Sequence, residues 1–153
     1  MTDRERFLSG RYIATLATEN EDGSSHLTSV WFLYEEGVFF IPTGSATRKA
    51  RNVAERPRAA VMVDARSRGE LRGISVTGAA HLMTGEEALR LNERIHRRYL
   101  TEAGFQDPRL GQPITSSDDV TVQVRAARWS RWDMSEFFGD LFASPELVYP
   151  LDG

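Results

Sequence analysis

The chain has 153 residues, of which 41% are hydrophobic and 27% charged, and its formal net charge is −3 at pH 7. This composition is typical of a globular protein, the length favours a single domain over residues 1–153, and the charge gives no general attraction to nucleic acid. The chain contains no cysteine, which excludes disulfides, iron–sulfur clusters and a cysteine nucleophile. No signal-peptide pattern and no run of roughly 20 apolar residues is present, so we expect a cytoplasmic protein with no membrane or nucleic-acid partner.

The first part of the chain predicts an antiparallel meander. We expect a short helix over residues 3–8 and strands over 11–18, 25–34 and 38–42. The strands are rich in β-branched and aromatic residues, and turns containing Asp and Gly separate them. Connections this short join antiparallel strands, because parallel strands need a long crossover.

The rest of the chain alternates helices and strands. A helix is expected over residues 46–56, strands over 59–63, 74–82 and 120–124, and a second helix from a capping-box match at Thr84 to about residue 100. Residues 101–119 contain Gly, Pro and Ser and are expected to form a long loop. Six strands with two or three helices predict a mainly β protein built as a small antiparallel barrel.

A C-terminal docking tail is expected over residues 134–153. Its large apolar side chains are Phe137, Phe138, Leu141, Phe142, Leu147, Val148, Tyr149 and Leu151. A segment this apolar is expected to dock, either on its own barrel or across a dimer.

Residues 43–52 carry the clearest chemical pattern, since they follow a strand and open a helix. A helix N-terminus presents unpaired N–H groups and partial positive charge, so it binds anions. Hydroxyl donors come from Thr43, Ser45 and Thr47, and positive charge comes from Arg48, Lys49 and Arg51. The pattern predicts a site for one terminal phosphate, although the spacing is not that of a Walker loop. The alternative is that Ser45 only caps the helix and the basic side chains are solvated.

Other chemistry-bearing residues receive structural interpretations. The histidines His26, His81 and His96 are scattered, so no metal site is predicted. We interpret His96, which lies among arginines, as part of a solvated helix face. The acidic pairs at 86–87 and 118–119 are interpreted as capping and loop residues, and no catalytic side chain is named.

The order of these motifs resembles that of the pyridoxamine 5′-phosphate oxidase-like family. The run Thr43…Thr47-Arg48-Lys49 is similar to the family's Thr-x3-Ser-Arg-Lys phosphate-binding segment. Further similar segments lie at 13–18, 29–32, 73–82 and 132–133, so the resemblance covers about residues 8–133. It implies a six-stranded antiparallel split β-barrel that forms a homodimer, with FMN bound at the dimer interface.

The resemblance also implies roles for individual residues. Arg48 and Lys49 would contact the flavin phosphate, to which Thr43 and Thr47 would donate hydrogen bonds. Ser29, Val30 and Trp31 would lie along the isoalloxazine ring, and Trp132 would approach the flavin from its own chain or from the partner. The complete set of predicted cofactor-binding residues is Ser29, Val30, Trp31, Thr43, Ser45, Thr47, Arg48, Lys49, Arg72 and Trp132.

Two departures from the family pattern bear on the activity. Gly73, flanked by Arg72, stands where the oxidase has a glutamine, and the tail has no Arg-x-His stretch for pyridoxal phosphate. The resemblance therefore implies an FMN-dependent oxidoreductase that transfers hydride to or from a small molecule other than pyridoxamine phosphate. The alternatives are a reductase that uses the deazaflavin coenzyme F-420, or a non-enzymatic flavin- or haem-binding protein.

Overall fold

A computed structural model describes residues 1–67, 69–150 and 152, so Arg68 and, in the predicted tail, Leu151 and Gly153 lie outside the described residues. One antiparallel sheet runs through this part of the chain in the order β2-β1-β5-β6-β7-β4-β3. The strands are β1 (Ala14–Glu19), β2 (Ser25–Val30), β3 (Leu33–Glu35), β4 (Val38–Thr43), β5 (Arg58–Ser67), β6 (Glu70–Met83) and β7 (Val120–Asp133). The helices are α1 (Asp3–Leu8), α2 (Arg48–Glu55), α3 (Gly85–Tyr99), α4 (Glu102–Gln106), α5 (Gly111–Ser117) and α6 (Ser135–Phe142).

The predicted mainly β, antiparallel architecture is confirmed, but the described residues form seven strands where six were predicted. The difference arises because the expected strand over 25–34 is two strands. β2 pairs with β1, whereas β3 pairs with β4 at the opposite edge of the sheet. The chain crosses between them at Trp31 and Phe32, and the Phe32 side chain is fully buried.

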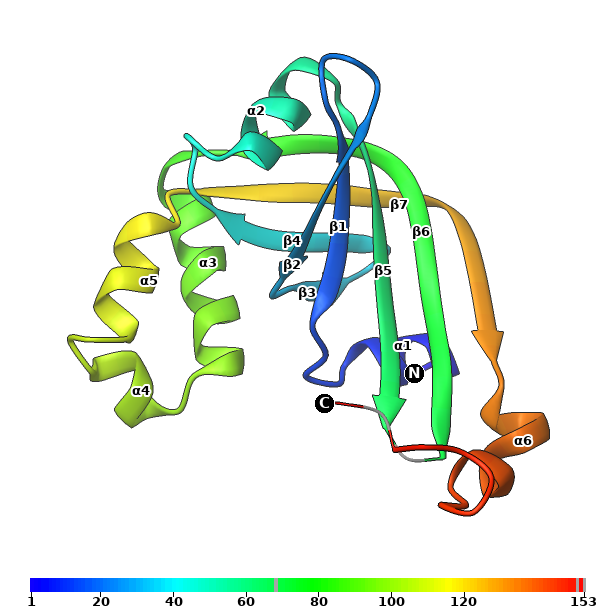
Figure 1. The fold of residues 1–153 in the computed structure, drawn as a ribbon. Coiled ribbons are helices and arrows are strands. Elements are labelled where there is room, and N and C mark those ends of the chain that lie inside the picture. The colour runs from blue at the N-terminus through cyan, green and yellow to red at the C-terminus, as the bar shows by residue number, and fades with distance from the viewer. Residues whose placement is uncertain (68, 151, 153) are drawn as a thin grey trace.

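The two longest strands, β6 and β7, bend together and so belong to both halves of the sheet (Figure 1). Their register shifts between Thr77 and Gly78. A Cβ at position 78 would overlap the carbonyl oxygen of Arg125, so only glycine permits this close approach of the two backbones. A bulge of this kind bends a strand and increases its twist.

The core lies inside the curved sheet and under the first two helices. Phe7 and Leu8 of α1 and Val53 of α2 pack against buried strand residues such as Phe39 and Ile41. Helices α3, α4 and α5 gather on one side of the sheet (Figure 1), where α3 contacts β4 and β7. None of the helices in the described residues is both long and apolar enough to span a membrane.

Two local predictions were wrong. Residues 101–119 are not one loop, because they contain α4 and α5. Thr101 caps α4 by accepting a hydrogen bond from Gly104 N, and Gly111 packs directly on the Phe105 carbonyl. The capping box at Thr84 does not form, since the Thr84 side chain makes no capping hydrogen bond and the next residue has a positive φ of 73°.

The C-terminal tail docks only in part. Helix α6 rests on the end of β6, where Met134 N donates to Leu71 O at 2.8 Å. The apolar side chains of the tail remain largely in solvent, with Phe137 75% exposed and Tyr149 92% exposed. The tail therefore presents an apolar surface that no other described part of the chain covers.

Candidate functional site

A cavity of about 680 Å³ opens beside the connection between β4 and α2. We call it the loop cavity, after residues 43–47, which form this connection. Six of the ten residues predicted to bind a cofactor line it, namely Ser29, Val30, Trp31, Thr43, Thr47 and Lys49. The other side of the cavity is formed by Ile114, Ser117 and Asp118 from α5 and its C-terminus.

The loop is fixed by its own hydrogen bonds. Thr47, not Ser45, is the N-cap of α2, and its Oγ1 accepts from Ala50 N. Thr47 Oγ1 also donates to Gly44 O at 2.8 Å and lies 3.1 Å from Oγ1 of the buried Thr43. Helix α2 thus begins two residues later than predicted, and the interpretation of Ser45 as its cap was wrong.

The two basic residues predicted to contact phosphate differ in position. Lys49 is half-buried, lines the loop cavity and has no ion pair among the residues that the structure describes. Arg48 is exposed and lies outside the lining of this cavity. The structure therefore gives Lys49 the position from which an ammonium group can reach an anion in the cavity.

Ser45 is hydrogen-bonded to a carboxylate of its own chain. Its N–H and Oγ donate to the two oxygens of Asp119 at 2.6 and 2.7 Å. These hydrogen bonds hold the pKa of Asp119 below its usual value. Asp119 begins the segment leading into β7, so this pair ties the loop to that strand.

The Trp31 side chain, which lines the loop cavity, packs against two further aromatic rings. The Trp31 and Tyr99 rings are parallel, with centroids 4.9 Å apart, and the His96 ring meets Trp31 edge-on at 6.3 Å. Tyr99 Oη donates to Tyr12 O at 2.7 Å, and burial raises the pKa of its hydroxyl. Trp31 is therefore held in one orientation by residues of α3.

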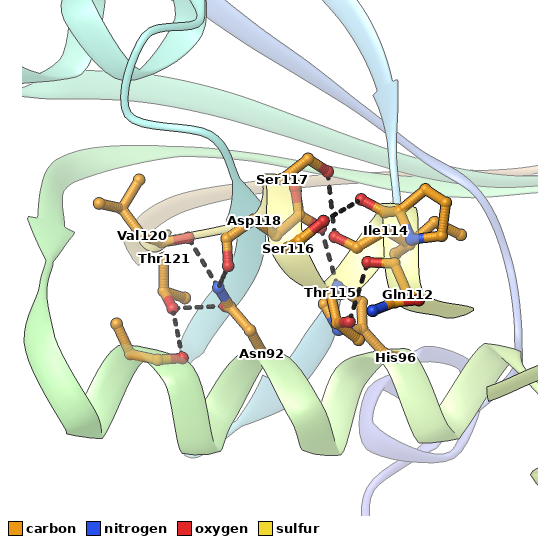
Figure 2. Close-up of polar contacts among 12 residues, drawn as sticks. Asn92, His96, Gln112, Ile114, Thr115, Ser116, Ser117, Asp118, Val120 and Thr121 are labelled. Carbon is orange, nitrogen blue, oxygen red and sulfur yellow. Dashed lines mark hydrogen bonds and ion pairs between the residues drawn. The ribbon is translucent and has the colours of Figure 1, made fainter. Parts of the chain in front are cut away.

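The prediction that His96 belongs to a solvated face was wrong. Its residue is only 1% exposed, and Nε2 lies 2.8 Å from Oδ2 of Asp118. Figure 2 shows His96 and Asn92 on the same helix, facing the segment that joins α5 to β7. The sequence held a signal for this, because Ala88, Asn92 and His96 are spaced by four residues and share the buried face of α3.

A second cavity of about 840 Å³ lies where the ends of β6 and β7 meet α1, and we call it the strand-end cavity. It contains Arg72 and Trp132, the two predicted residues farthest along the chain. Arg72 pairs with Glu70 at 2.6 Å, and the Trp132 ring lies directly over Gly73. The two cavities share no lining residue, so eight of the ten predicted cofactor-binding residues divide between two places, and Ser45 and Arg48 line neither cavity.

A metal ion has no evident site in the described part of the chain. No group of three or more His, Cys, Asp or Glu side chains is suitably placed there to hold one. The polar groups that converge on the loop cavity are the threonine hydroxyls, the Lys49 ammonium, the Asp118 carboxylate and the N-terminus of α2.

Comparison with known proteins identifies the family of this chain. The family model described as pyridoxamine 5′-phosphate oxidase matches residues 3–133, whereas no curated protein matches the chain. Among solved structures, a conserved hypothetical protein of Mycobacterium tuberculosis is 29% identical, with a TM-score of 0.68, over 87% of this chain and 85% of that chain.

Two more distant structures share the fold. A protein described as an F420 reductase is 21% identical, with a TM-score of 0.66, over 85% of this chain and 98% of its own. The heme storage protein HutZ of Vibrio cholerae is 14% identical, with a TM-score of 0.61, over 86% of this chain and 92% of its own. On the strength of the family match over residues 3–133, this chain belongs to the pyridoxamine 5′-phosphate oxidase family.

Proposed function

We propose that this protein is an FMN-binding oxidoreductase that transfers hydride to or from a small molecule. The observation that carries the proposal is the loop cavity, in which the Lys49 ammonium lies beside the N-terminus of α2 and has no ion pair with any described residue. Its volume of about 680 Å³ lies within the range of roughly 300–1,000 Å³ that is usual for sites of small ligands.

The donors at one end of the loop cavity suit a phosphate. The first N–H groups of α2, at Arg48 and Lys49, have no acceptor within the helix. A helix N-terminus favours a negative charge, and an ammonium adds a fixed positive charge beside it. The hydroxyl protons of Thr43 and Thr47 are engaged within the loop, so we assign the phosphate first to Lys49 and these N–H groups.

The walls of the cavity suit a flat ring. Ile13, Val30 and Ile114 supply apolar surface, and Trp31 supplies an aromatic side chain held by Tyr99. Bound FMN would supply a ring that accepts or gives up hydride. The chain's own contribution is to bind the phosphate, hold the ring against this wall and limit access of water.

A second copy of the chain would account for the division of the predicted residues between two cavities. The resemblance implies a dimer with flavin at the interface, and the strand-end cavity holds Arg72 and Trp132 apart from the loop cavity. We propose that the two residues of one chain approach the loop cavity of its partner. The uncovered apolar side chains of the tail, such as Phe137, fit burial in such an interface.

Coenzyme F-420 is the second candidate cofactor. The similarity to a protein described as an F420 reductase favours it, and it too carries a phosphate on a polyol chain. Its acidic tail would need further basic side chains near Lys49, for which the exposed Arg48 and Arg51 are candidates.

Titration of the ligand-free protein with FMN and with F-420, followed by the fluorescence of each cofactor, tests the proposal. We expect saturable binding of FMN that is tighter than that of F-420. Tighter binding of F-420 would show that the deazaflavin, and not FMN, is the cofactor. A protein that binds neither cofactor but gains a Soret band with haem would contradict the oxidoreductase assignment.

A further inference from the structure

We propose that Asp118 accepts a hydrogen bond from a hydroxyl group of the ligand in the loop cavity, and that His96 is the residue that positions Asp118. The inference rests on the proposed function in one respect, since the polyol chain of FMN would supply the hydroxyl. It assigns the cavity a ligand class, namely a phosphate ester that carries hydroxyl groups.

The backbone and the side chain of Asp118 are both held by α3. Asn92 Nδ2 donates to Asp118 O at 3.1 Å and to Val120 O at 2.9 Å, and Thr121 Oγ1 donates to Asn92 Oδ1 at 2.6 Å (Figure 2). The Asp118 carboxylate uses Oδ2 to meet His96. A residue anchored at both places keeps its carboxylate in one orientation.

One oxygen of this carboxylate is left for a ligand. Asp118 lines the loop cavity with its side chain 21% exposed, and Oδ1 has no hydrogen-bond partner among the described residues. The neighbouring Asp119 differs, because both of its oxygens bind Ser45 and it does not line the cavity. Of these two adjacent acids, Asp118 is the one available to a bound molecule.

The surroundings of His96 fix the direction of the hydrogen bond. Nδ1 of His96 is buried and has no partner among the described residues. A proton placed on Nδ1 would therefore be a buried donor without an acceptor, which is costly. With the ring proton on Nε2, His96 donates to Oδ2, and Oδ1 of Asp118 is left to accept a hydrogen bond from a molecule in the cavity.

A carboxylate in this position selects the chemistry of its ligand. An ionised carboxylate only accepts hydrogen bonds, and it repels a second anionic group. Lys49 lines the same cavity and forms no ion pair within the described part of the chain, so it is available to the phosphate. The cavity therefore suits a molecule that has a phosphate for Lys49 and hydroxyl donors for Asp118.

The experiment measures dissociation constants of FMN, ribitol 5-phosphate and pentyl phosphate for the wild type and for Asp118→Asn. The side-chain carbonyl of the introduced asparagine would still accept a hydrogen bond from His96. This arrangement turns the NH₂ group of the asparagine, a donor, toward the cavity. We expect about tenfold weaker binding of FMN and of ribitol 5-phosphate, because a charge-assisted hydrogen bond is lost. The affinity for pentyl phosphate, which lacks the hydroxyl groups, should not fall.

Asp119→Asn is the matched control, since it removes the same charge one residue away. It should leave the ratio of ribitol 5-phosphate affinity to pentyl phosphate affinity at its wild-type value. The role of His96 is tested with His96→Phe, which removes the donor, and with His96→Gln, which restores one. The glutamine variant should bind ribitol 5-phosphate more tightly than the phenylalanine variant, whereas equal binding by both would show that His96 only fills space.

The outcomes separate this inference from the proposed function. Unchanged affinity of Asp118→Asn for ribitol 5-phosphate would overturn the inference. It would also be overturned if Asp119→Asn lowered the ratio of ribitol 5-phosphate affinity to pentyl phosphate affinity as much as Asp118→Asn does. A wild type that binds ribitol 5-phosphate through Asp118 but does not bind FMN would refute the proposed function and leave the inference standing. A wild type that binds neither would refute both.

Discussion

Replacement of Lys49 by alanine tests the phosphate end of the loop cavity. Lys49 is the basic side chain that lines this cavity, and it has no ion pair among the described residues. The substitution removes the ammonium group, leaves the N–H groups of α2 in place and breaks no hydrogen bond of the loop. Its main effect should therefore fall on the ligand and not on folding.

The expected loss follows from the position of the side chain. A hydrogen bond to a charged group contributes about 1.5–3 kcal/mol. Lys49 is only half-buried, so solvent screens its charge and the lower part of that range applies. We expect a loss of about 1.5–2 kcal/mol, which corresponds to roughly 10- to 30-fold weaker binding of FMN.

The assay is titration of flavin fluorescence at low and high salt, with riboflavin as the ligand that lacks a phosphate. FMN affinity should fall in Lys49→Ala, the difference from wild type should narrow at high salt, and riboflavin affinity should not change. Arg48→Ala is the matched control, because Arg48 is exposed and does not line the cavity. Equal FMN affinity in wild type and Lys49→Ala, or a larger loss in Arg48→Ala, would refute the assignment.

Four further results are expected. A Cβ at Gly73 would overlap the Trp132 ring, so Gly73→Ala should destabilise the fold by about 1–3 kcal/mol in urea unfolding, and an unchanged midpoint would show that the ring moves aside freely. The pKa of Asp119 is lowered by its hydrogen bonds from Ser45, so its carboxylate stabilises the fold above the unfolded value of about 3.9 and this contribution is lost as the pH falls through the lower folded value. The difference in unfolding free energy between wild type and Asp119→Asn should accordingly be largest at neutral pH and disappear at acid pH. A difference that widens on acidification would contradict this stabilising role of the Asp119 carboxylate. Removal of the chain after Asp133 should yield monomers with weakened FMN binding, as light scattering and titration would report, whereas a stable dimer with normal affinity would show that the tail does not cross between chains. Pyridoxamine 5′-phosphate should not be oxidised, because the tail lacks the family's Arg-x-His stretch, and steady release of peroxide with this substrate would prove that inference wrong.

Local patterns in the sequence were sufficient to predict most of the sheet. Runs of β-branched and aromatic residues between turns located β1 and β4, and the alternation of apolar and polar residues located the beginning of β7. The length of α3 was close to that expected. The sequence did not reveal that β6 begins at Glu70 or that β7 continues past the bulge opposite Gly78 to Asp133, because strand length there depends on pairing between distant segments. Helices α4 and α5 were missed because Gly104 and Gly111 are poor helix formers, and tertiary contacts overrode that propensity.

The site was predictable where it is local in sequence and not where it depends on the fold. Thr43, Thr47 and Lys49 lie within seven positions of one another, and they line one cavity. The pairing of His96 with Asp118 joins residues 22 positions apart. The signal in the sequence was the four-residue spacing of Ala88, Asn92 and His96 on the buried face of α3. The arginines next to His96 suggested a solvated face instead.

Native mass spectrometry of the purified protein, combined with its absorbance spectrum, tests whether the protein is a dimer that binds FMN. We expect a dimer that carries one FMN per chain and shows the absorption bands of a flavin, and we expect less bound FMN in Lys49→Ala. A protein that is isolated as a monomer, contains no flavin or deazaflavin and takes up neither when they are added would contradict this expectation.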